Sequence, residues 1–231
     1  MNFLTKKQAV KNLLIYYVGY LFVFPILLAL FLSIMDSHHF SINLGIAELI
    51  IYGTVSGFVL YTNWSLLKTD WIALKGKTKN MLKEVGKHML LMYMLNIICN
   101  VIIINLTGSV QSNNQSEIVA LVESRFTITV FLTLFFAPLV EEMVFRCSIY
   151  SLFYKKNKVL TVVLASLAFG LIHVMGSIFA QDWNDLLHLL TYASMGFCLS
   201  KCYGKTKNIF GPILLHFFNN LIGLLMILLL G

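Results

Sequence analysis

The stretch FFAPLVEEMVFRCSIY, residues 135–150, carries Glu141, Glu142 and Arg146 inside an otherwise apolar segment. Charge is expensive to bury in a membrane, and adjacent carboxylates also repel each other. Glu142 and Arg146 are four residues apart with the glutamate first, the favourable order for an ion pair along a helix. Glu141 points about 100° away around the helix and has no such partner in its own segment. We therefore interpret Glu142 as structural and Glu141 as chemical, in a role that suits a general base.

Two later apolar segments carry polar side chains at helical spacing. His216 and Asn220 are four residues apart in PILLHFFNNLIG, and an imidazole and a carboxamide on one face can hold an oxyanion by hydrogen bonds. Phe169 and His173 share a face in LAFGLIHVMG, so the aromatic ring can shield the histidine from lipid. A lone histidine or asparagine in a span can also simply hydrogen-bond a neighbouring helix. We interpret three asparagines in that way, namely Asn96, Asn100 and Asn219.

Membrane-spanning helices must position these side chains. The chain has 231 residues, of which 58% are hydrophobic and 12% are charged, about half the charged share of a soluble domain. A helix needs about 20 mostly apolar residues to cross a bilayer. The fourth span could be broken at Pro138. Residues 67–86 are expected to form a basic surface loop, whose Trp, Leu and Lys suggest a helix lying along the membrane surface. We predict an all-α, polytopic transmembrane helical bundle of about seven spans, over residues 12–35, 46–66, 86–106, 126–153, 159–180, 186–203 and 209–230.

The lysines indicate the orientation of this bundle. Every lysine lies before the first span or in every second loop after it, within residues 6–11, 68–87, 155–158 and 201–207. Cytoplasmic loops carry the excess of Lys and Arg, so we predict a cytoplasmic N-terminus and an outer C-terminus in the cell membrane. The net charge of +7 is then a topology signal, and nucleic acid is not needed to explain it.

The candidate groups are predicted to lie at similar depths. At the helical rise, Glu141 would lie roughly 18 Å, His173 roughly 21 Å and Asn220 roughly 16 Å from the cytoplasmic ends of their spans. His216 would lie about 10 Å from that end. Ionisable groups inside spans usually face the bundle interior or a water-filled cavity. We therefore expect them to converge on one polar site, nearer the cytoplasmic side than the outer one.

Three motifs occur in order, each in a predicted span. They are EEMVFR at 141–146 in the pattern E-E-x-x-x-R, FGLIH at 169–173 as F-x-x-x-H, and HFFNN at 216–220 as H-x-x-x-N. Together they resemble the CPBP family of intramembrane proteases, which includes the CAAX prenyl endopeptidases and the Abi or bacteriocin-processing group. The resemblance covers about residues 120–230. We accordingly expect N-terminal transmembrane spans over 1–119 and a catalytic helical core over 120–231.

The resemblance implies an all-helical membrane enzyme that hydrolyses peptide bonds near the cytosolic face. By position, Glu141 would activate the water and His173 would help to hold it. His216 and Asn220 would form the oxyanion hole. The substrate would be a membrane-associated or prenylated protein or peptide. Three further residues would shape the site, namely Glu142, Arg146 and Phe169.

A metal ion is an alternative to this arrangement. Glu141, His173 and His216 are a plausible two-histidine, one-glutamate zinc set of the kind that catalytic sites use. However, the sequence has no H-E-x-x-H motif, and Asn220 would be an unusual fourth ligand. A glutamate-activated water with His and Asn as oxyanion donors uses every residue without a metal. We therefore favour a site with no cofactor and keep a zinc-dependent protease as the alternative.

Two functions of other classes are also compatible with the pattern. One is a non-catalytic bacteriocin self-immunity or binding protein, which the family resemblance permits. The other is a proton-coupled transporter, because buried Glu and His also build proton relays. The transporter is the weaker hypothesis, since the chain shows no internal repeat of the kind from which many transporters are built.

Overall fold

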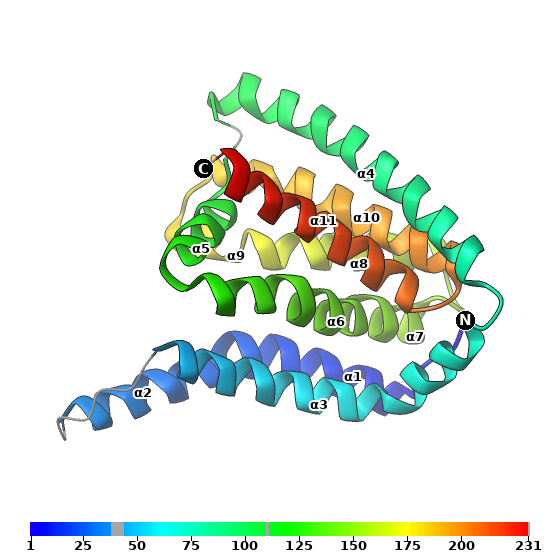
Figure 1. The fold of residues 1–231 in the computed structure, drawn as a ribbon, viewed down its shortest axis with the longest axis horizontal. Helices are drawn as coiled ribbons and strands as arrows, with labels where there is room; N and C mark the ends of the chain where they lie inside the picture. Colours follow the sequence, from blue (N-terminus) through cyan, green and yellow to red (C-terminus); the bar gives the residue numbers. More distant parts are fainter. Residues whose placement is uncertain (38–43, 110, 231) are drawn as a thin grey trace.

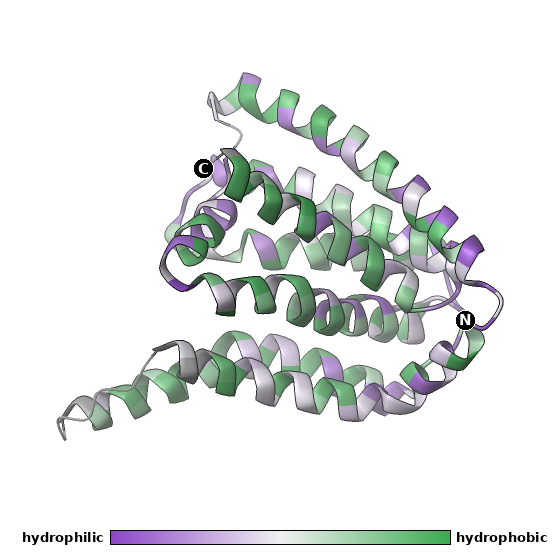
Figure 2. Cartoon of the chain, viewed as in Figure 1, coloured by the Kyte–Doolittle hydropathy of each residue, from purple (hydrophilic) through white to green (hydrophobic). Residues whose placement is uncertain are grey.

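The chain is built from long helices joined by short turns, and most of these helices run roughly side by side (Figure 1). The computed structural model describes residues 1–37, 44–109 and 111–230. Within those ranges there is no strand, which confirms the predicted all-α class. Apolar residues predominate along most of the helices (Figure 2), as expected of segments that face lipid or each other.

Three runs of helix make up the N-terminal half. The first is continuous from α1 (Lys6–Leu14) through the π-helical segment η1 (Ile15–Val23) to α2 (Phe24–Ser37). It is followed by α3 (Leu44–Ala73) and α4 (Thr78–Thr107), which are each 30 residues long. At the helical rise this is roughly 45 Å, which exceeds the hydrocarbon thickness of a bilayer.

A long, bent helix opens the C-terminal half. It comprises α5 (Asn113–Phe131), η2 (Leu132–Phe136), α6 (Ala137–Glu141), η3 (Glu142–Ser148) and α7 (Ile149–Phe153). The bend is at Arg125, whose φ of −146° and ψ of 53° leave the helical range. The helix continues through Pro138 from η2 into α6, so the break predicted there is wrong. Proline removes one helical hydrogen bond, and the π-helical turn η2 just before it accommodates that loss without ending the helix.

Five shorter or later helices complete the chain. They are α8 (Lys158–His173), α9 (Met175–Ala180), the 3-10 helix η4 (Asp185–His188), α10 (Leu189–Thr206) and α11 (Phe210–Leu230). The predicted span 159–180 is thus two helices, because Val174 interrupts it with φ of −111° and ψ of 10°. As a result α8 ends on His173, one of the candidate catalytic residues.

Several of these helices can cross a membrane. Among the described residues, four helical runs are long and apolar enough by length and composition, namely Lys6–Met35, Thr78–Thr107, Asn113–Phe153 and Phe210–Leu229. The apolar helix α8 is shorter. The chain is therefore a polytopic membrane protein. The count of seven spans, which adds α3, α8 and α10 to these four, stays a prediction.

The helix ends that carry the lysines gather at one end of the molecule, beside the N-terminus (Figure 1). Asn2 Nδ2 donates to Asp70 Oδ1 near the end of α3 at 2.5 Å, and the backbone N–H of Leu4 donates to Ser151 Oγ at 2.8 Å. Between α10 and α11, Asn208 Nδ2 donates to the carbonyl oxygen of Asp70 at 2.7 Å. The segregation of lysines in the sequence therefore corresponds to a segregation in space. The compartment that this end faces stays a prediction.

The predicted basic surface loop, residues 67–86, is mostly helical, as its mix of Trp, Leu and Lys indicates, but it forms the ends of two long helices and not a helix of its own. α3 continues to Ala73 and α4 begins at Thr78, so only residues 74–77 form a turn. Lysine and leucine are good helix formers, so both helices extend beyond their apolar stretches. The location of this segment at the membrane surface stays a prediction.

Helices α8 and α10 pack at close range, and this fixes the element that carries His173. A Cβ atom at Gly170 would lie 2.9 Å from the backbone nitrogen of Ala193, and one at Gly196 would lie 2.9 Å from Cα of Ser166. Such distances leave no room for a side chain. Small residues at an interface let two membrane helices approach this closely.

Candidate active site

Glu142 and Arg146 form the ion pair that their four-residue spacing predicts. Arg146 Nε lies 3.1 Å from Glu142 Oε2, and neither side chain is exposed. Arg146 Nη2 also donates to the carbonyl oxygen of Gly196 at 3.2 Å, and its Cζ lies 4.7 Å from the centre of the Phe169 ring. Buried charges are tolerated when they are paired and hydrogen-bonded. This pair therefore ties the bent helix to α8 and α10.

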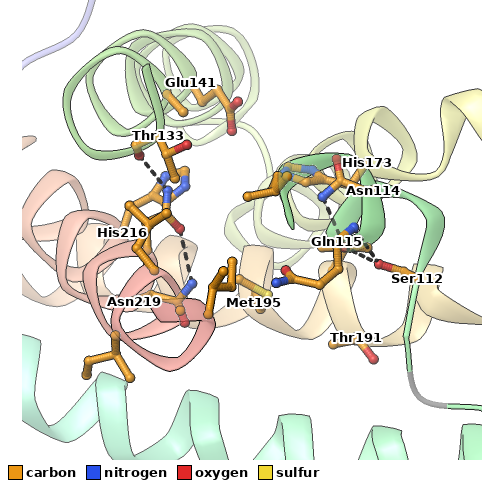
Figure 3. Close-up of a pocket in the computed structure, with 18 of the residues that line it drawn as sticks. Ser112, Asn114, Gln115, Thr133, Glu141, His173, Thr191, Met195, His216 and Asn219 are labelled. Atoms are coloured by element: carbon orange, nitrogen blue, oxygen red, sulfur yellow. Dashed lines mark hydrogen bonds between the residues drawn. The ribbon is translucent and has the colours of Figure 1, made fainter. Parts of the chain in front are cut away.

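The two glutamates lie at a change of helix geometry. α6 ends at Glu141, and the π-helical segment η3 begins at Glu142. π-helical turns occur frequently at functional sites, where the extra residue per turn changes the direction of side chains. Here Glu142 faces Arg146, while Glu141 faces into a cavity (Figure 3).

His216 takes its orientation from Glu142. Its Nδ1 lies 3.0 Å from Glu142 Oε1, so the carboxylate accepts a hydrogen bond from the ring on α11 while its other oxygen pairs with Arg146. The imidazole is 3% exposed. Because Nδ1 carries the proton in this bond, Nε2 can donate a hydrogen bond only when the ring holds a second proton.

Glu141 has a hydrogen-bond partner that the sequence did not reveal. The Tyr16 hydroxyl donates to Glu141 Oε1 at 3.2 Å, from a helix 125 residues earlier in the chain. Tyr16 is 1% exposed, and a buried tyrosine hydroxyl usually finds a partner. Among the described residues, the buried Glu141 Oε2 has no hydrogen-bond partner. The tyrosines of the first span were the available signal, since their hydroxyls need acceptors inside a membrane.

His173 is held by a backbone bond and two aromatic rings. Its Nδ1 donates to the carbonyl oxygen of Phe169 at 2.8 Å, which leaves Nε2 as the acceptor of a neutral ring. The imidazole stacks on Tyr192 with ring centres 4.7 Å apart, and the Phe169 ring lies 4.5 Å away. Phe169 is fully buried between His173, Arg146 and His216. It therefore packs among the polar groups of the site.

Asn220 is positioned by two hydrogen bonds. Its Nδ2 donates to the carbonyl oxygen of Thr133 at 2.9 Å, and its Oδ1 accepts from Asn219 Nδ2 at 3.2 Å. One N–H of the Asn220 amide is left to donate elsewhere. Asn219 was interpreted as a packing residue, but it also lines the cavity and orients its neighbour.

A cavity of about 520 Å³ joins these groups. Glu141, His173, His216 and Asn220 all line it, so the structure brings the four predicted catalytic residues together, as their depths indicated. Figure 3 shows Glu141, His173 and His216 around the cavity. Glu142 and Arg146 lie behind this lining. The cavity continues past the expected site towards Ser112, Asn114 and His188, at the end of the bundle away from the lysines, and these residues are part of the same wall.

The cavity belongs to helices from both halves of the chain. Tyr20 and Tyr52 of the N-terminal half line it, together with Asn96 and Asn100 of α4. The boundary predicted between residues 119 and 120 falls inside α5. The division into two domains stays a prediction, but the site draws on residues from both sides of it.

The predicted zinc ligands do not form a ready metal site. Within the described ranges, no three His, Cys, Asp or Glu side chains are grouped so that they could hold a metal ion. Glu142 accepts a hydrogen bond from Nδ1 of His216, and the Phe169 carbonyl accepts one from Nδ1 of His173, so Nε2 is the nitrogen that each ring could offer to a metal. Because the three side chains are not grouped as a metal site, binding of zinc by Glu141 and the two histidines would require them to move together.

Fold and site together define a class, an all-helical membrane protein with a buried carboxylate, two histidines and an asparagine around one cavity. Comparison with known sequences shows which family of membrane proteins part of the chain resembles. Residues 123–222 match the profile of the Rce1-like type II CAAX prenyl endopeptidases. The resemblance inferred from the three motifs is thus confirmed for this segment, which contains all of the predicted site residues.

Individual relatives are similar over parts of their length. The chain is 30% identical over 111 residues to the putative membrane peptidase YdiL of Bacillus subtilis, covering 48% of this chain and 41% of the relative. It is 26% identical over 133 residues to the membrane-embedded CAAX protease MroQ of Staphylococcus aureus, covering 56% and 51%. An uncharacterized protein of Mycoplasma capricolum is 26% identical, covering 91% of this chain and 67% of the relative. The matches thus span about half the length of YdiL and MroQ and about two thirds of the Mycoplasma protein. No solved structure matches the chain.

Proposed function

We propose that the protein is an intramembrane endopeptidase of the cell membrane. It hydrolyses a peptide bond of a membrane-associated or prenylated protein or peptide. The Glu141 carboxylate carries the proposal, because its side chain lines the cavity, Tyr16 holds one oxygen, and the other oxygen is buried with no partner among the described residues. An unsatisfied buried oxygen costs free energy, and that cost is understandable where the oxygen has to bind water. The match of residues 123–222 to Rce1-like endopeptidases supports the same chemistry.

Glu141 acts as the general base in the proposed reaction. A water molecule donates a hydrogen bond to Glu141 Oε2 and a second one to Nε2 of His173. Glu141 takes a proton from this water as its oxygen attacks the carbonyl carbon of the substrate. Because His173 is held by Phe169 and Tyr192, its ring keeps the water in position.

His216 and Asn220 stabilise the charge that develops on the carbonyl oxygen. The tetrahedral oxyanion accepts hydrogen bonds from Nε2 of the doubly protonated His216 and from the remaining N–H of Asn220. When the intermediate collapses, the carbon–nitrogen bond breaks and Glu141 returns its proton to the leaving amine. The protein needs no cofactor for this sequence.

The function is tested by comparing protein and peptide termini in cells by mass spectrometry. Three chains are expressed at equal abundance, namely wild type, Glu141→Gln and the control Glu123→Gln, whose carboxylate lies on an exposed position of α5. New termini are expected with wild type and Glu123→Gln, and not with Glu141→Gln. Identical termini in all three would contradict the proposal and leave a binding or immunity role.

A further inference from the structure

Helix α4 presents a polar stripe to the cavity. Tyr93, Asn96 and Asn100 all line it, and their spacing of three and four residues places them on one face of the helix. Beside them, Ile97 and Ile98 are exposed on the outer surface. α4 therefore has an apolar side that faces lipid and a polar side that faces the cavity. This helix lies outside the segment that matches the Rce1-like profile.

The amide oxygens of Asn96 and Asn100 accept hydrogen bonds, whereas their amide nitrogens have no acceptor among the described residues. Ser194 Oγ donates to Asn96 Oδ1 at 3.3 Å, and Thr191 Oγ1 donates to Asn100 Oδ1 at 3.4 Å. The hydroxyl hydrogen of Ser194 is shared with the carbonyl oxygen of Thr191 at 2.8 Å, so these long contacts orient the two amides without locking them. No described residue accepts a hydrogen bond from Nδ2 of either side chain. Each amide thus offers N–H donors to whatever fills the cavity.

The spacing of the two amides matches that of an extended peptide. Residues four apart on a helix are separated by roughly 6 Å along its axis. In an extended chain, carbonyl groups that point the same way recur every second residue, roughly 6.6 Å apart. Asn96 and Asn100 can therefore donate to two successive same-side carbonyls of one extended segment.

Apart from Glu141, the residues that line the cavity favour an uncharged ligand over a charged one. Glu141 is the only Asp, Glu, Lys or Arg among the described lining residues. Away from the stripe, Leu132, Phe136, Ile222 and Met226 give the cavity an apolar side. Away from Glu141, a charged side chain would lose its hydration without gaining an ion-pair partner, whereas uncharged side chains would pack well.

We propose that Asn96 and Asn100 bind the main chain of an extended, uncharged peptide segment that leads to Glu141. An extended chain inside a membrane must find partners for its backbone groups, whereas a helix satisfies its own. The amide stripe supplies such partners, so the substrate is bound unwound. The inference rests on the proposed function for the fate of the peptide, but it concerns binding and can be measured without cleavage.

The test measures peptide binding in a background that does not cleave. The probe is a mixture of short, uncharged, fluorescently labelled peptides of randomised sequence, and the full chain carries Glu141→Gln in lipid nanodiscs. Adding Asn96→Leu and Asn100→Leu together is expected to raise the Kd from fluorescence anisotropy by roughly tenfold, the effect of one to two hydrogen bonds. The same peptides with a central lysine are expected to bind more weakly to the parent.

One control separates binding from helix packing. Asn105→Leu changes another asparagine of α4, one that is exposed and donates to the carbonyl oxygen of Val101 at 2.7 Å. This control should leave the Kd within about twofold of the parent, because it removes no donor from the cavity. If the double leucine variant unfolds, the serine variants of the same two positions replace it.

The outcomes distinguish this inference from the proposed function. An unchanged Kd in the double variant, an equal loss in Asn105→Leu, or no binding by the parent would each overturn the amide site. If binding depends on the asparagines but wild type cleaves none of the peptides, the amide site stands and the proposed protease function is refuted. If wild type cleaves the peptides and binding does not depend on the asparagines, the proposed protease function stands and the amide site is refuted.

Discussion

A hydrogen bond from Tyr16 orients the Glu141 carboxylate, and this orientation should affect the rate of catalysis. With one oxygen accepting from the tyrosine at 3.2 Å, the carboxylate cannot rotate freely and is held beside the cavity that it lines. A base held in a single orientation needs no rearrangement when the water is deprotonated. Tyr16 touches neither water nor substrate in this scheme, so it is a positioning residue.

Tyr16→Phe should lower the kcat of peptide cleavage by about tenfold, since the loss of one hydrogen bond to a charged group raises the barrier by roughly 1.5 kcal/mol. The KM should change little. Tyr17→Phe is the matched control, because the Tyr17 hydroxyl donates to the carbonyl oxygen of Ala168 instead, at 3.4 Å. Equal kcat values for the two variants would contradict the positioning role.

Glu142→Ala should destabilise the fold, unlike Glu141→Gln. Removing Glu142 leaves Arg146 buried without its ion pair and His216 without its acceptor. Breaking a buried pair in this way costs roughly 3–5 kcal/mol. The measurement is thermal unfolding in detergent, where Glu142→Ala should melt well below wild type and Glu141→Gln close to it. Similar melting temperatures would show that the two glutamates do not divide their roles as described.

At the scale of helices, the close contact of α8 with α10 determines where His173 and Tyr192 meet. Gly196→Ala should lower stability by roughly 1–3 kcal/mol, because a Cβ there overlaps the backbone of Ser166 and overpacks the interface. Gly204→Ala in the same helix meets nothing within 4 Å and should be neutral or slightly stabilising. Comparison of their melting temperatures checks this. A neutral Gly196→Ala would contradict the tight packing.

Helices and candidate residues could be predicted from the sequence, because a hydrophobic run in a membrane protein has few structures open to it. The Glu142–Arg146 pair also followed from local spacing. What could not be predicted depends on tertiary contacts. The Tyr16 bond joins segments far apart in the chain, and the continuation of the helix through Pro138 depends on π-helical turns with no clear sequence pattern. A helix was indicated over residues 67–86, but its continuity with α3 and α4 was not, since lysines indicate polarity and not where a long helix ends.

For the molecule as a whole, the clustering of lysine-bearing ends gives a testable orientation. All of those ends lie beside the N-terminus, whereas the C-terminal end of α11 lies at the opposite end of the bundle (Figure 1). Because lysine-rich ends stay in the cytoplasm, a reporter that is active only in the cytoplasm should work when fused to the N-terminus and fail at the C-terminus. The reverse pattern would invert the orientation, and equal activity at both ends would require an even number of spans.

The cavity adds a second whole-molecule feature. It extends from Glu141 towards the end of the bundle that carries η4 and the start of α5, away from the lysines. Sequence depth alone indicated a site nearer the lysine-bearing end. The lining therefore indicates that a peptide has room to lie beyond the reacting groups on the other side, where α4 supplies its amides.

The most direct test of the account is the rate at which the purified chain, in lipid nanodiscs, cleaves internally quenched peptides built from the termini found in cells. Wild type and Glu123→Gln should cleave at the same rate, and a strong chelator should leave that rate unchanged. Glu141→Gln should lose activity by at least about a thousandfold while it still binds the peptide, since the general base is removed and the cavity is not. Activity that survives in Glu141→Gln would contradict the central claim. Activity lost to chelation and restored by zinc would replace the metal-free mechanism with the zinc-dependent one.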